Sequence, residues 1–238
     1  DIKITCRILP IAVSNLIYGY IVVWQTIREL TTFDNIVIEQ ASTIFALDRI
    51  KAREIEEVKV RIRQEFFDDL LTGNITSSHS LQTLCDIHGL KSDYMYYCIV
   101  IDIEPIEVNN DDDLINRKYL IESKAKKCVN LVYDFSNQLN GEIICFFRNN
   151  RIIILIGKNE YNPSLTINEA KAFSNKFYKV LNKELPGTTF LIGIGRQYKA
   201  LSTLHKSFSE ANEAIRLMKQ FDKNTGVSHF EDYYVYHF

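Results

Sequence analysis

The sequence of 238 residues has no long hydrophobic run, and this lack limits where the chain works. Its longest apolar stretches are far shorter than the about 20 residues that a membrane-spanning helix needs. The N-terminus also lacks the charged stretch followed by an apolar one that marks a secretory signal. We therefore expect a cytoplasmic protein that does not contact a membrane. Because the first residue is Asp1 and not methionine, we expect the chain to begin inside a longer polypeptide.

The sequence also lacks any pair of cysteines at C-x-x-C spacing. The cysteines are odd in number and widely spaced, which is atypical of a disulfide framework or a zinc site, so we expect reduced, mostly buried thiols. They are Cys6, Cys85, Cys98, Cys128 and Cys145. The histidines are scattered, and His79 and His88 have no second ligand at helical spacing. We predict no catalytic residue, no bound cofactor and no metal site.

An excess of positive charge is missing as well. The 28 lysines and arginines are balanced by 30 aspartates and glutamates, giving a formal net charge of −2. A nucleic-acid-binding domain is expected to carry a basic patch and a high pI, so this chain is not expected to bind DNA directly. With 46% hydrophobic and 24% charged residues, the composition is that of an ordinary soluble globular protein.

The N-terminal part has the pattern of an antiparallel hairpin. Ile2–Leu9 and Leu16–Trp24 are rich in β-branched and aromatic residues, and Pro10 and Ser14–Asn15 between them favour a turn. A two-stranded hairpin is marginal in water. We therefore expect it to pack on the helix that follows or on protein outside this chain.

A very long helix is predicted from Asp34 to Leu71, because the sequence has no glycine or proline from there until Gly73. Its apolar stripe is Val37, Ala41, Ile44, Phe45, Ile55, Val58, Ile62, Phe66 and Leu70. The remaining positions become dense in lysine, arginine and glutamate, which leaves only a narrow stripe. We favour a linker helix that pairs with a second copy in a homodimer. The alternative is a long surface helix lying on its own domain.

The rest of the chain alternates between helical and strand patterns. In chain order these predict a helix at Leu81–His88, a strand at Tyr94–Ile103, a helix from Asp111–Asp113 to about Leu139, a hairpin of Glu142–Phe147 and Arg151–Ile156 with an Asn149–Asn150 turn, a helix at Ile167–Leu185, a strand starting at Thr188, a helix at Leu201–Met218 and a strand at Val227–Phe230. This order predicts an α+β fold, with helices packed on a sheet.

Gly193 and Gly195 end an apolar strand and give half of a dinucleotide-binding fingerprint. The third glycine position is Tyr198, and the following helix begins several residues too late to reach a pyrophosphate. We therefore favour the alternative in which the two small residues let the backbone of another element approach closely. Ser202 is the predicted N-cap of the helix, with Ser207 and Glu210 as a capping box if it starts one turn later.

Several segments of the sequence resemble a known family. The segment IGIGRQYKALSTLHKSFSEANEAIRLMKQF, followed by VSHFEDYYVY, resembles the C-terminal part of the degenerate GGDEF-like domain of PucR/CdaR bacterial transcriptional regulators. VRIRQEFFDDLLTGNI resembles the stretch before that domain, and GYIVVW with the long helix resembles the end of a GAF-like sensory domain. The resemblance implies a GAF-like end at 1–45, a linker helix at 46–79 and a GGDEF-like, ferredoxin/cyclase-like domain at 80–238.

In that family a sensory domain, the GGDEF-like domain and a DNA-binding helix-turn-helix follow one another. The chain stops at Phe238, before a helix-turn-helix could fit. The resemblance therefore implies a fragment of a ligand-responsive regulator that carries the signal-transmission and dimerisation elements. DNA would be bound only through a helix-turn-helix outside this chain, and the small-molecule inducer is not identified.

The rival hypothesis is a nucleotide-binding or weakly active GGDEF-type cyclase. The resemblance implies a metal-binding carboxylate at the end of the first strand, where Asp102 stands, with Glu104 on the same face. Otherwise Asp102 is a strand-end carboxylate that faces solvent or a neighbouring lysine. The signature turn reads Phe147-Arg148-Asn149-Asn150-Arg151, without its glycines and acidic residues. We therefore predict that the chain is not an enzyme.

Overall fold

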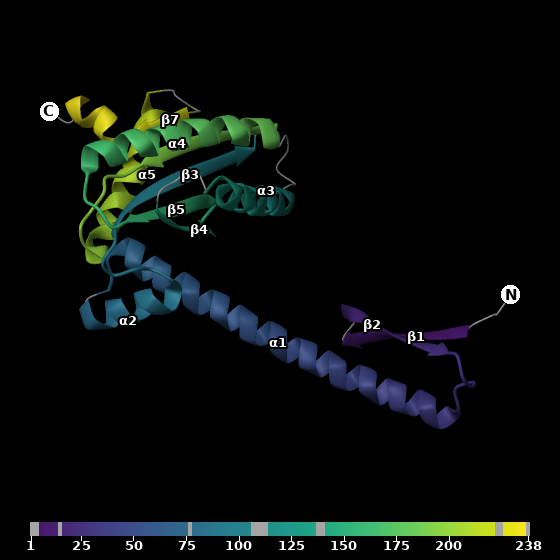
Figure 1. Cartoon of the computed structure of the whole chain (residues 1–238). Helices are drawn as coiled ribbons and strands as arrows, with labels where there is room; N and C mark the ends of the chain where they lie inside the picture. The colour runs from purple at the N-terminus through teal and green to yellow at the C-terminus, as the bar shows by residue number, and fades with distance from the viewer. Residues whose placement is uncertain are drawn as a thin grey trace. The chain divides into compact units, whose positions relative to one another are not determined.

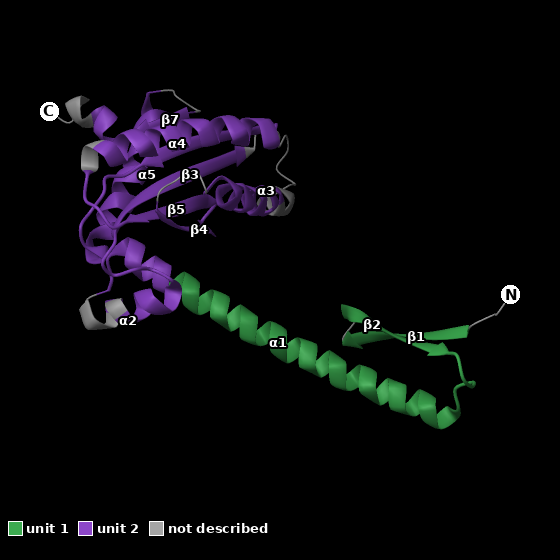
Figure 2. Ribbon diagram, viewed as in Figure 1, with its two compact units in different colours: residues 1–65 green, residues 66–238 purple. Residues whose placement is uncertain are grey.

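The computed structural model describes residues 5–13, 16–75, 78–105, 114–136, 141–221 and 226–236. The chain divides into two compact units, residues 1–65 and residues 66–238 (Figure 2). The boundary between them falls inside the long helix α1, Thr32–Thr72. The Asp111–Asp113 run, which we predicted at a helix start, lies outside the described residues.

Unit 1 contains the predicted hairpin and most of α1. Strands β1, Thr5–Val13, and β2, Leu16–Gln25, pair antiparallel, which confirms the hairpin. The hairpin packs on α1, as expected: Ser42 Oγ donates a hydrogen bond to the Pro10 carbonyl oxygen at 2.8 Å, and Ala46 is fully buried. The hairpin therefore covers one face of this helix.

Thr31 caps the N-terminus of α1 together with Asp34. The Asp34 N–H donates to Thr31 Oγ1 at 3.2 Å, and the Thr31 N–H donates back to Asp34 Oδ2 at 2.8 Å. This is the reciprocal pattern of a capping box. Hydrogen bonds from the Arg28 guanidinium and then from Thr31 hold the pKa of the Asp34 carboxyl well below its usual range. At the other end Gly73 has a φ of 76°, a conformation that glycine adopts without strain, and α1 stops there as predicted.

Unit 2 has the predicted mixture of helices and strands (Figure 1). Its elements are α2, Ser78–His88; β3, Met95–Pro105; α3, Leu114–Phe135; β4, Glu142–Arg148; β5, Arg151–Lys158; α4, Pro163–Glu184; β6, Thr188–Ile194; the 3-10 turn η3, Leu201–Thr203; α5, Leu204–Gln220; β7, Gly226–His229; and the 3-10 segment η4, Phe230–Tyr236. The strand order is β4-β5-β3-β6-β7. All neighbours pair antiparallel except β6 and β7, which are parallel.

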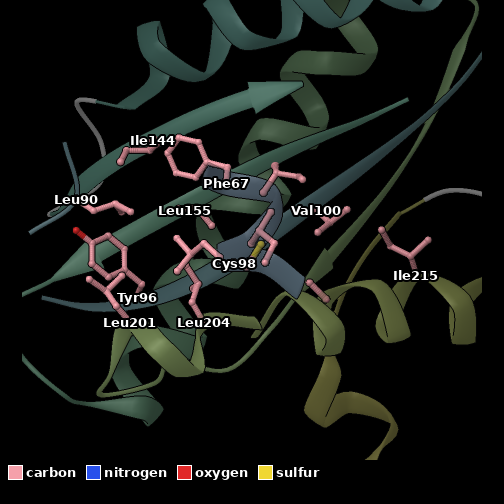
Figure 3. Packing of buried hydrophobic residues seen from close by; sticks show 14 of the residues in the cluster. Phe67, Leu90, Tyr96, Cys98, Val100, Ile144, Leu155, Leu201, Leu204 and Ile215 are labelled. Carbon is pink, nitrogen blue, oxygen red and sulfur yellow. The ribbon is translucent and has the colours of Figure 1, made fainter. Parts of the chain in front are cut away.

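The two faces of this sheet are covered by different helices. Alternate residues of β3, from Tyr97 to Ile103, pack in one apolar cluster with α3 and α4. The residues between them, Tyr96, Cys98 and Val100, pack in a second cluster with α5, α2 and the end of α1 (Figure 3). Because side chains alternate along a strand, Asp102 and Glu104 continue the second set and lie on the α5 side.

Two predicted helix starts were wrong. Ser202 is not the N-cap of α5, because the η3 turn precedes that helix and Thr203 stands at the cap position, where its Oγ1 donates to the Ala200 carbonyl oxygen at 2.6 Å and caps no helix N–H. Helix α4 begins at Pro163, before the predicted Ile167, because proline is preorganised for the first helical position and the Asn162 side chain accepts from the Leu165 N–H. Helix α3 is described as far as Phe135, and Leu139, near which we predicted its end, lies outside the described residues.

All five cysteines are free thiols, and four of them are buried. Burial raises the pKa of the Cys85 thiol to about 11 and that of the Cys128 thiol to about 12. Such buried thiols stay protonated and unreactive at neutral pH. The fifth cysteine, Cys6, is exposed. Among the described residues, no helix combines the length and the apolar character that crossing a membrane requires.

Candidate functional site

The register of the sheet brings together the Asp102 carboxylate and the hairpin turn, the two features that we compared with those of a GGDEF-type cyclase. Strand β3 lies between β5 and β6, and Asp102 is paired with Arg151 of β5 on one side and with Leu191 of β6 on the other. Arg151 directly follows the Asn149–Asn150 turn. The carboxylate at the end of β3 and the hairpin turn therefore lie side by side.

The turn itself has the backbone that a two-residue hairpin requires. Asn149 has a φ of 48° and Asn150 a φ of 61°, so both are in the left-handed region. Asparagine tolerates this conformation better than most residues, and the prediction of a tight asparagine turn is confirmed. Neither residue of the turn carries a carboxylate that could bind a cation strongly.

Asp102 and Glu104 are both bound to basic side chains. Lys219 Nζ of α5 lies 2.9 Å from Asp102 Oδ2 and 2.6 Å from Glu104 Oε1. Arg151 Nη2 lies 3.5 Å from the same oxygen of Asp102, and Arg151 Nη1 donates to Asn212 Oδ1 of α5 at 2.5 Å. We refer to these five residues as the Asp102 cluster.

The charges of the Asp102 cluster balance. Asp102 is only 8% exposed, and a carboxylate so far removed from water is costly unless it is paired. Burial alone lowers the pKa of the Lys219 ammonium, but its hydrogen bonds to Glu104 and Asp102 outweigh this effect, and the net pKa is raised. Lys219 is therefore a cation at neutral pH, and with Arg151 it offsets the two carboxylates.

The same residues are a poor fit for a divalent cation. Mg²⁺ and Ca²⁺ bind several oxygen ligands, among which carboxylates are the strongest. Among the described residues there is no group of three or more His, Cys, Asp or Glu side chains that could hold a metal ion. A cation at Asp102 and Glu104 would also have to displace the Lys219 ammonium. The arrangement fits an ion-pair cluster and not a metal centre.

Gly193 and Gly195 hold α5 close enough to the sheet for this cluster to form. A Cβ on Gly193 would lie 2.0 Å from the Ala211 carbonyl oxygen, and one on Gly195 would lie 2.0 Å from the Ser207 carbonyl oxygen. The helix therefore packs on β6 backbone against backbone. Ser207 Oγ also accepts a hydrogen bond from the Cys98 N–H at 2.9 Å. The interpretation of these glycines as packing residues is confirmed.

A second polar cluster fixes the loop between β6 and α5. Glu210, which is 8% exposed, accepts hydrogen bonds from the Arg196 N–H at 2.9 Å, from the Arg196 guanidinium and from Tyr198 OH at 2.6 Å. Hydrogen bonds to Glu210 raise the pKa of the Arg196 guanidinium. Glu210 therefore anchors the loop. It does not form the capping box with Ser207 that we considered for a later helix start.

A polar cavity of about 480 Å³ lies at the opposite end of β5 from Arg151. Its lining includes Tyr94, Glu160 and Asn162, together with Lys158 and Glu169, which form an ion pair. The Gln197 side chain joins the backbone of Asn162 to that of Glu160 nearby. None of the residues that the sequence singled out for a site lines this cavity.

Sequence reasoning found Asp102 and Glu104 but missed the residues that bind them. Arg151 could have been found from the hairpin register, because the residue after a two-residue turn faces the end of the neighbouring strand. Lys219 and Asn212 could not, because they follow Asp102 by more than a hundred residues and reach it only through the packing of α5 on β6. The structure bears out the alternative in which Asp102 faces a neighbouring lysine.

The five-stranded sheet with helices on both faces defines unit 2 as a cyclase-like α+β domain. The sequence profile of the GGDEF-like domain matches residues 72–217, and the chain belongs to this family. The match begins at the end of α1 and extends to Leu217 in α5.

Two solved structures are similar to this chain. One is the regulator of polyketide synthase expression from Bifidobacterium adolescentis, at 15% identity and a TM-score of 0.38 over 67% of this chain and 54% of that one. The other is the diguanylate cyclase SiaD from Pseudomonas aeruginosa, in complex with its activator SiaC, at 12% identity and a TM-score of 0.40 over 83% of this chain and 80% of that one. The chain thus spans about half the length of the first. No curated protein matches the sequence.

Proposed function

We propose that this chain is the signal-transmitting and dimerising part of a ligand-responsive bacterial transcriptional regulator of the PucR/CdaR type. In this proposal residues 1–45 are the end of a GAF-like sensory domain, and a helix-turn-helix outside this chain binds DNA. The GGDEF-like unit serves as a module without enzymatic activity. The observation that carries the absence of activity is the Asp102 cluster, in which Lys219 and Arg151 neutralise the two carboxylates. The transmitting role is supported by the GGDEF-like family and by the exposed apolar residues of α1.

The chemistry of a cyclase requires a different site. Phosphoryl transfer depends on metal ions that neutralise charge on the phosphates, and the protein must hold those ions with strong ligands. Here Lys219 binds Asp102 and Glu104, and the hairpin turn offers only asparagine side chains. A protein cation at the place of a metal stabilises the fold, but it leaves no carboxylate free for the ion.

The alternative is a domain that binds a nucleotide or retains weak cyclase activity. It is favoured by one observation, which is that two carboxylates remain on the same face at the end of β3. A nucleotide with its own Mg²⁺ would have to compete with Lys219 for them. Binding and catalysis are therefore tested separately below.

Catalysis is tested by incubating the chain with GTP and Mg²⁺ and separating the nucleotides by chromatography. We expect no cyclic or linear dinucleotide product from the wild type or from Lys219→Ala, which removes the competing cation. An active diguanylate cyclase serves as the positive control. Product from the wild type would overturn the proposal, because it would require a metal site at Asp102 and Glu104.

Binding is tested by titrating GTP with Mg²⁺ into the chain in a calorimeter. We expect no heat of binding from the wild type. Saturable heat that disappears in Asp102→Asn would instead support the nucleotide-binding alternative. Asp134→Asn, on a helix of the opposite face of the sheet, is the matched control, because it removes one carboxylate from a place outside the Asp102 cluster.

The proposed dimer is carried by α1. Residues 51–65 are all exposed, and this part of the helix includes Ile55, Val58 and Ile62 at 57%, 44% and 51% exposure. A helix in a protein gains most of its stability by packing an apolar face against another element, so these exposed apolar residues favour a partner. We propose that the partner is a second copy of the chain. A ligand would then act by favouring one of two packings of the paired helices.

A further inference from the structure

A set of mostly apolar positions on α1 repeats every eleven residues, and we call it the eleven-residue stripe. The first position of the repeat is Phe33, Ile44, Ile55 and Phe66; the fourth is Ile36, Leu47 and Val58; the eighth is Gln40, Lys51 and Ile62. Eleven residues fill three helical turns at about 3.67 residues per turn, so these three columns stay on one face along the whole helix. From Phe33 to Phe66, eight of the ten positions are apolar, and Asp69 follows at the next fourth position.

This stripe lies on the face of α1 that the hairpin leaves open. Ser42 and Ala46 are buried beneath β1 and β2, and each is about half a turn around the helix from Ile44. Ile44 is 66% exposed and Leu47 is 53% exposed. The hairpin therefore packs against one side of α1, and the eleven-residue stripe is on the other.

We propose that this stripe packs against the same stripe of a second copy, with the two helices parallel and in register from Phe33 to Ile62. This inference rests on the dimer of the proposed function and adds its orientation and geometry. A seven-residue repeat makes helices supercoil with a left hand, whereas an eleven-residue repeat gives a right-handed supercoil. The paired helices of this protein have the second geometry.

The charges beside the stripe favour the parallel orientation. Glu54 and Glu65 lie along one edge of the stripe, and Asp48 and Lys59 lie along the other. In a parallel pair, a residue on the first edge faces a residue five positions further along on the second edge, so Glu54 faces the partner's Lys59. In an antiparallel pair the first edge would face the same edge of the partner helix, so negative charges would face one another.

Two polar residues interrupt the stripe and fix its register. Gln40 and Lys51 occupy the eighth position of the repeat, and in a parallel, in-register pair each faces its own counterpart. A polar residue at such a position lowers stability but disfavours other registers, which would bury it against an apolar side chain. At Phe66 the stripe enters the core of unit 2, where this side chain is 5% exposed and stacks on the His88 ring at 4.4 Å. The pairing therefore ends at Ile62.

Disulfide trapping tests the orientation. In a Cys6→Ser background, which removes the exposed cysteine, single cysteines are placed at either end of the stripe as Ile36→Cys and Val58→Cys. A disulfide requires Cα atoms within about 7 Å, which a parallel pair satisfies for each position with its own counterpart. We expect each variant to form a covalent dimer by itself under mild oxidation. Glu56→Cys, on an outward-facing position of the same helix, is the control that should not.

The possible outcomes separate this inference from the proposed function. Ile36 and Val58 are equally distant from Leu47, so an antiparallel pair centred there would form a disulfide only in a mixture of the two variants. That result would overturn the parallel orientation and leave the α1 dimer intact. A wild type that is monomeric by sedimentation would overturn both. A dimer in which neither variant cross-links, alone or in the mixture, would contradict the parallel, in-register pairing.

Lys51→Ile provides an independent measurement. A lysine between two stripes weakens the pair, so replacing it with isoleucine should lower the dimer dissociation constant by about tenfold or more. Lys59→Ile places the same side chain at the edge of the stripe and removes the contact to the partner's Glu54, so it should not strengthen the dimer to the same extent. An unchanged or higher dissociation constant for Lys51→Ile would contradict the inference.

Discussion

The closeness of α5 to the sheet makes Gly195→Ala a strong test of how unit 2 is built. The added Cβ would lie 2.0 Å from the Ser207 carbonyl oxygen and 2.6 Å from Ser207 Oγ. Ordinary contacts of a Cβ are about 3.4 Å or longer, so α5 has to move away from β6 by more than 1 Å. Overpacking of this kind costs about 1–3 kcal/mol, and alanine regains about 0.4–1 kcal/mol through the unfolded chain. We expect a net loss of about 1–2 kcal/mol.

Urea unfolding followed by circular dichroism measures this loss. At a slope of about 2 kcal/mol/M, a loss of about 1–2 kcal/mol lowers the unfolding midpoint of unit 2 by about 0.5–1 M. Fluorescence of the single tryptophan, Trp24, reports on the hairpin of unit 1 and should change little. Gly195→Ala with Ser207→Ala should not restore the midpoint, because the clash with the backbone oxygen remains.

The matched control is Gly19→Ala, where the new Cβ would meet only Ile11 Cδ1, at an ordinary 3.8 Å. It should leave the midpoint of unit 2 unchanged. A wild-type midpoint for Gly195→Ala would mean that α5 does not pack backbone against backbone on β6.

Three further predictions concern polar side chains with close hydrogen-bond partners. Burial lowers the pKa of His229, whose Nδ1 accepts from the Glu231 N–H, so stability should fall as pH drops below the ordinary value of 6.5, and His229→Gln should weaken this dependence in urea titrations at pH 5 and 7. Glu210→Gln weakens the charged hydrogen bonds that hold the β6–α5 loop and should lower the free energy of unfolding by about 2 kcal/mol. Because the pKa of Lys219 is raised, its stabilising effect is present below the ordinary lysine pKa of 10.5 and is lost as the pH rises above that value. The wild type should therefore lose more stability than Lys219→Met between pH 9 and 11.5. A Lys219→Met profile parallel to that of the wild type would argue against the ion pairs with Asp102 and Glu104.

The elements of the fold could be predicted because local patterns specify them. The long helix followed from a segment without glycine or proline, and Gly73 and the Asn149–Asn150 turn marked ends that require left-handed backbone. Helix starts were predicted less well. Pro163 and Asn162 begin α4 with a cap that apolar periodicity does not reveal, and η3 precedes α5 because tertiary packing decides where that helix begins.

The candidate site could be predicted only in part, for a physical reason. Asp102 and Glu104 are adjacent in one strand, so their shared face follows from the period of a strand. Their partner Lys219 is brought to them by the approach of α5 to β6, which depends on the missing side chains of Gly193 and Gly195. The glycines were visible in the sequence, but their effect on a distant ion pair exists only in three dimensions.

We propose that α1 joins two copies of a regulator through its exposed stripe. The most direct test is the mass of the chain in solution, measured by sedimentation at micromolar concentration for the wild type and for a variant with Ile55, Val58 and Ile62 replaced by glutamate. We expect twice the chain mass for the wild type and the single chain mass for the variant, with circular dichroism of unit 2 unchanged. A wild type that sediments as a single chain, or a variant that stays dimeric, would contradict it.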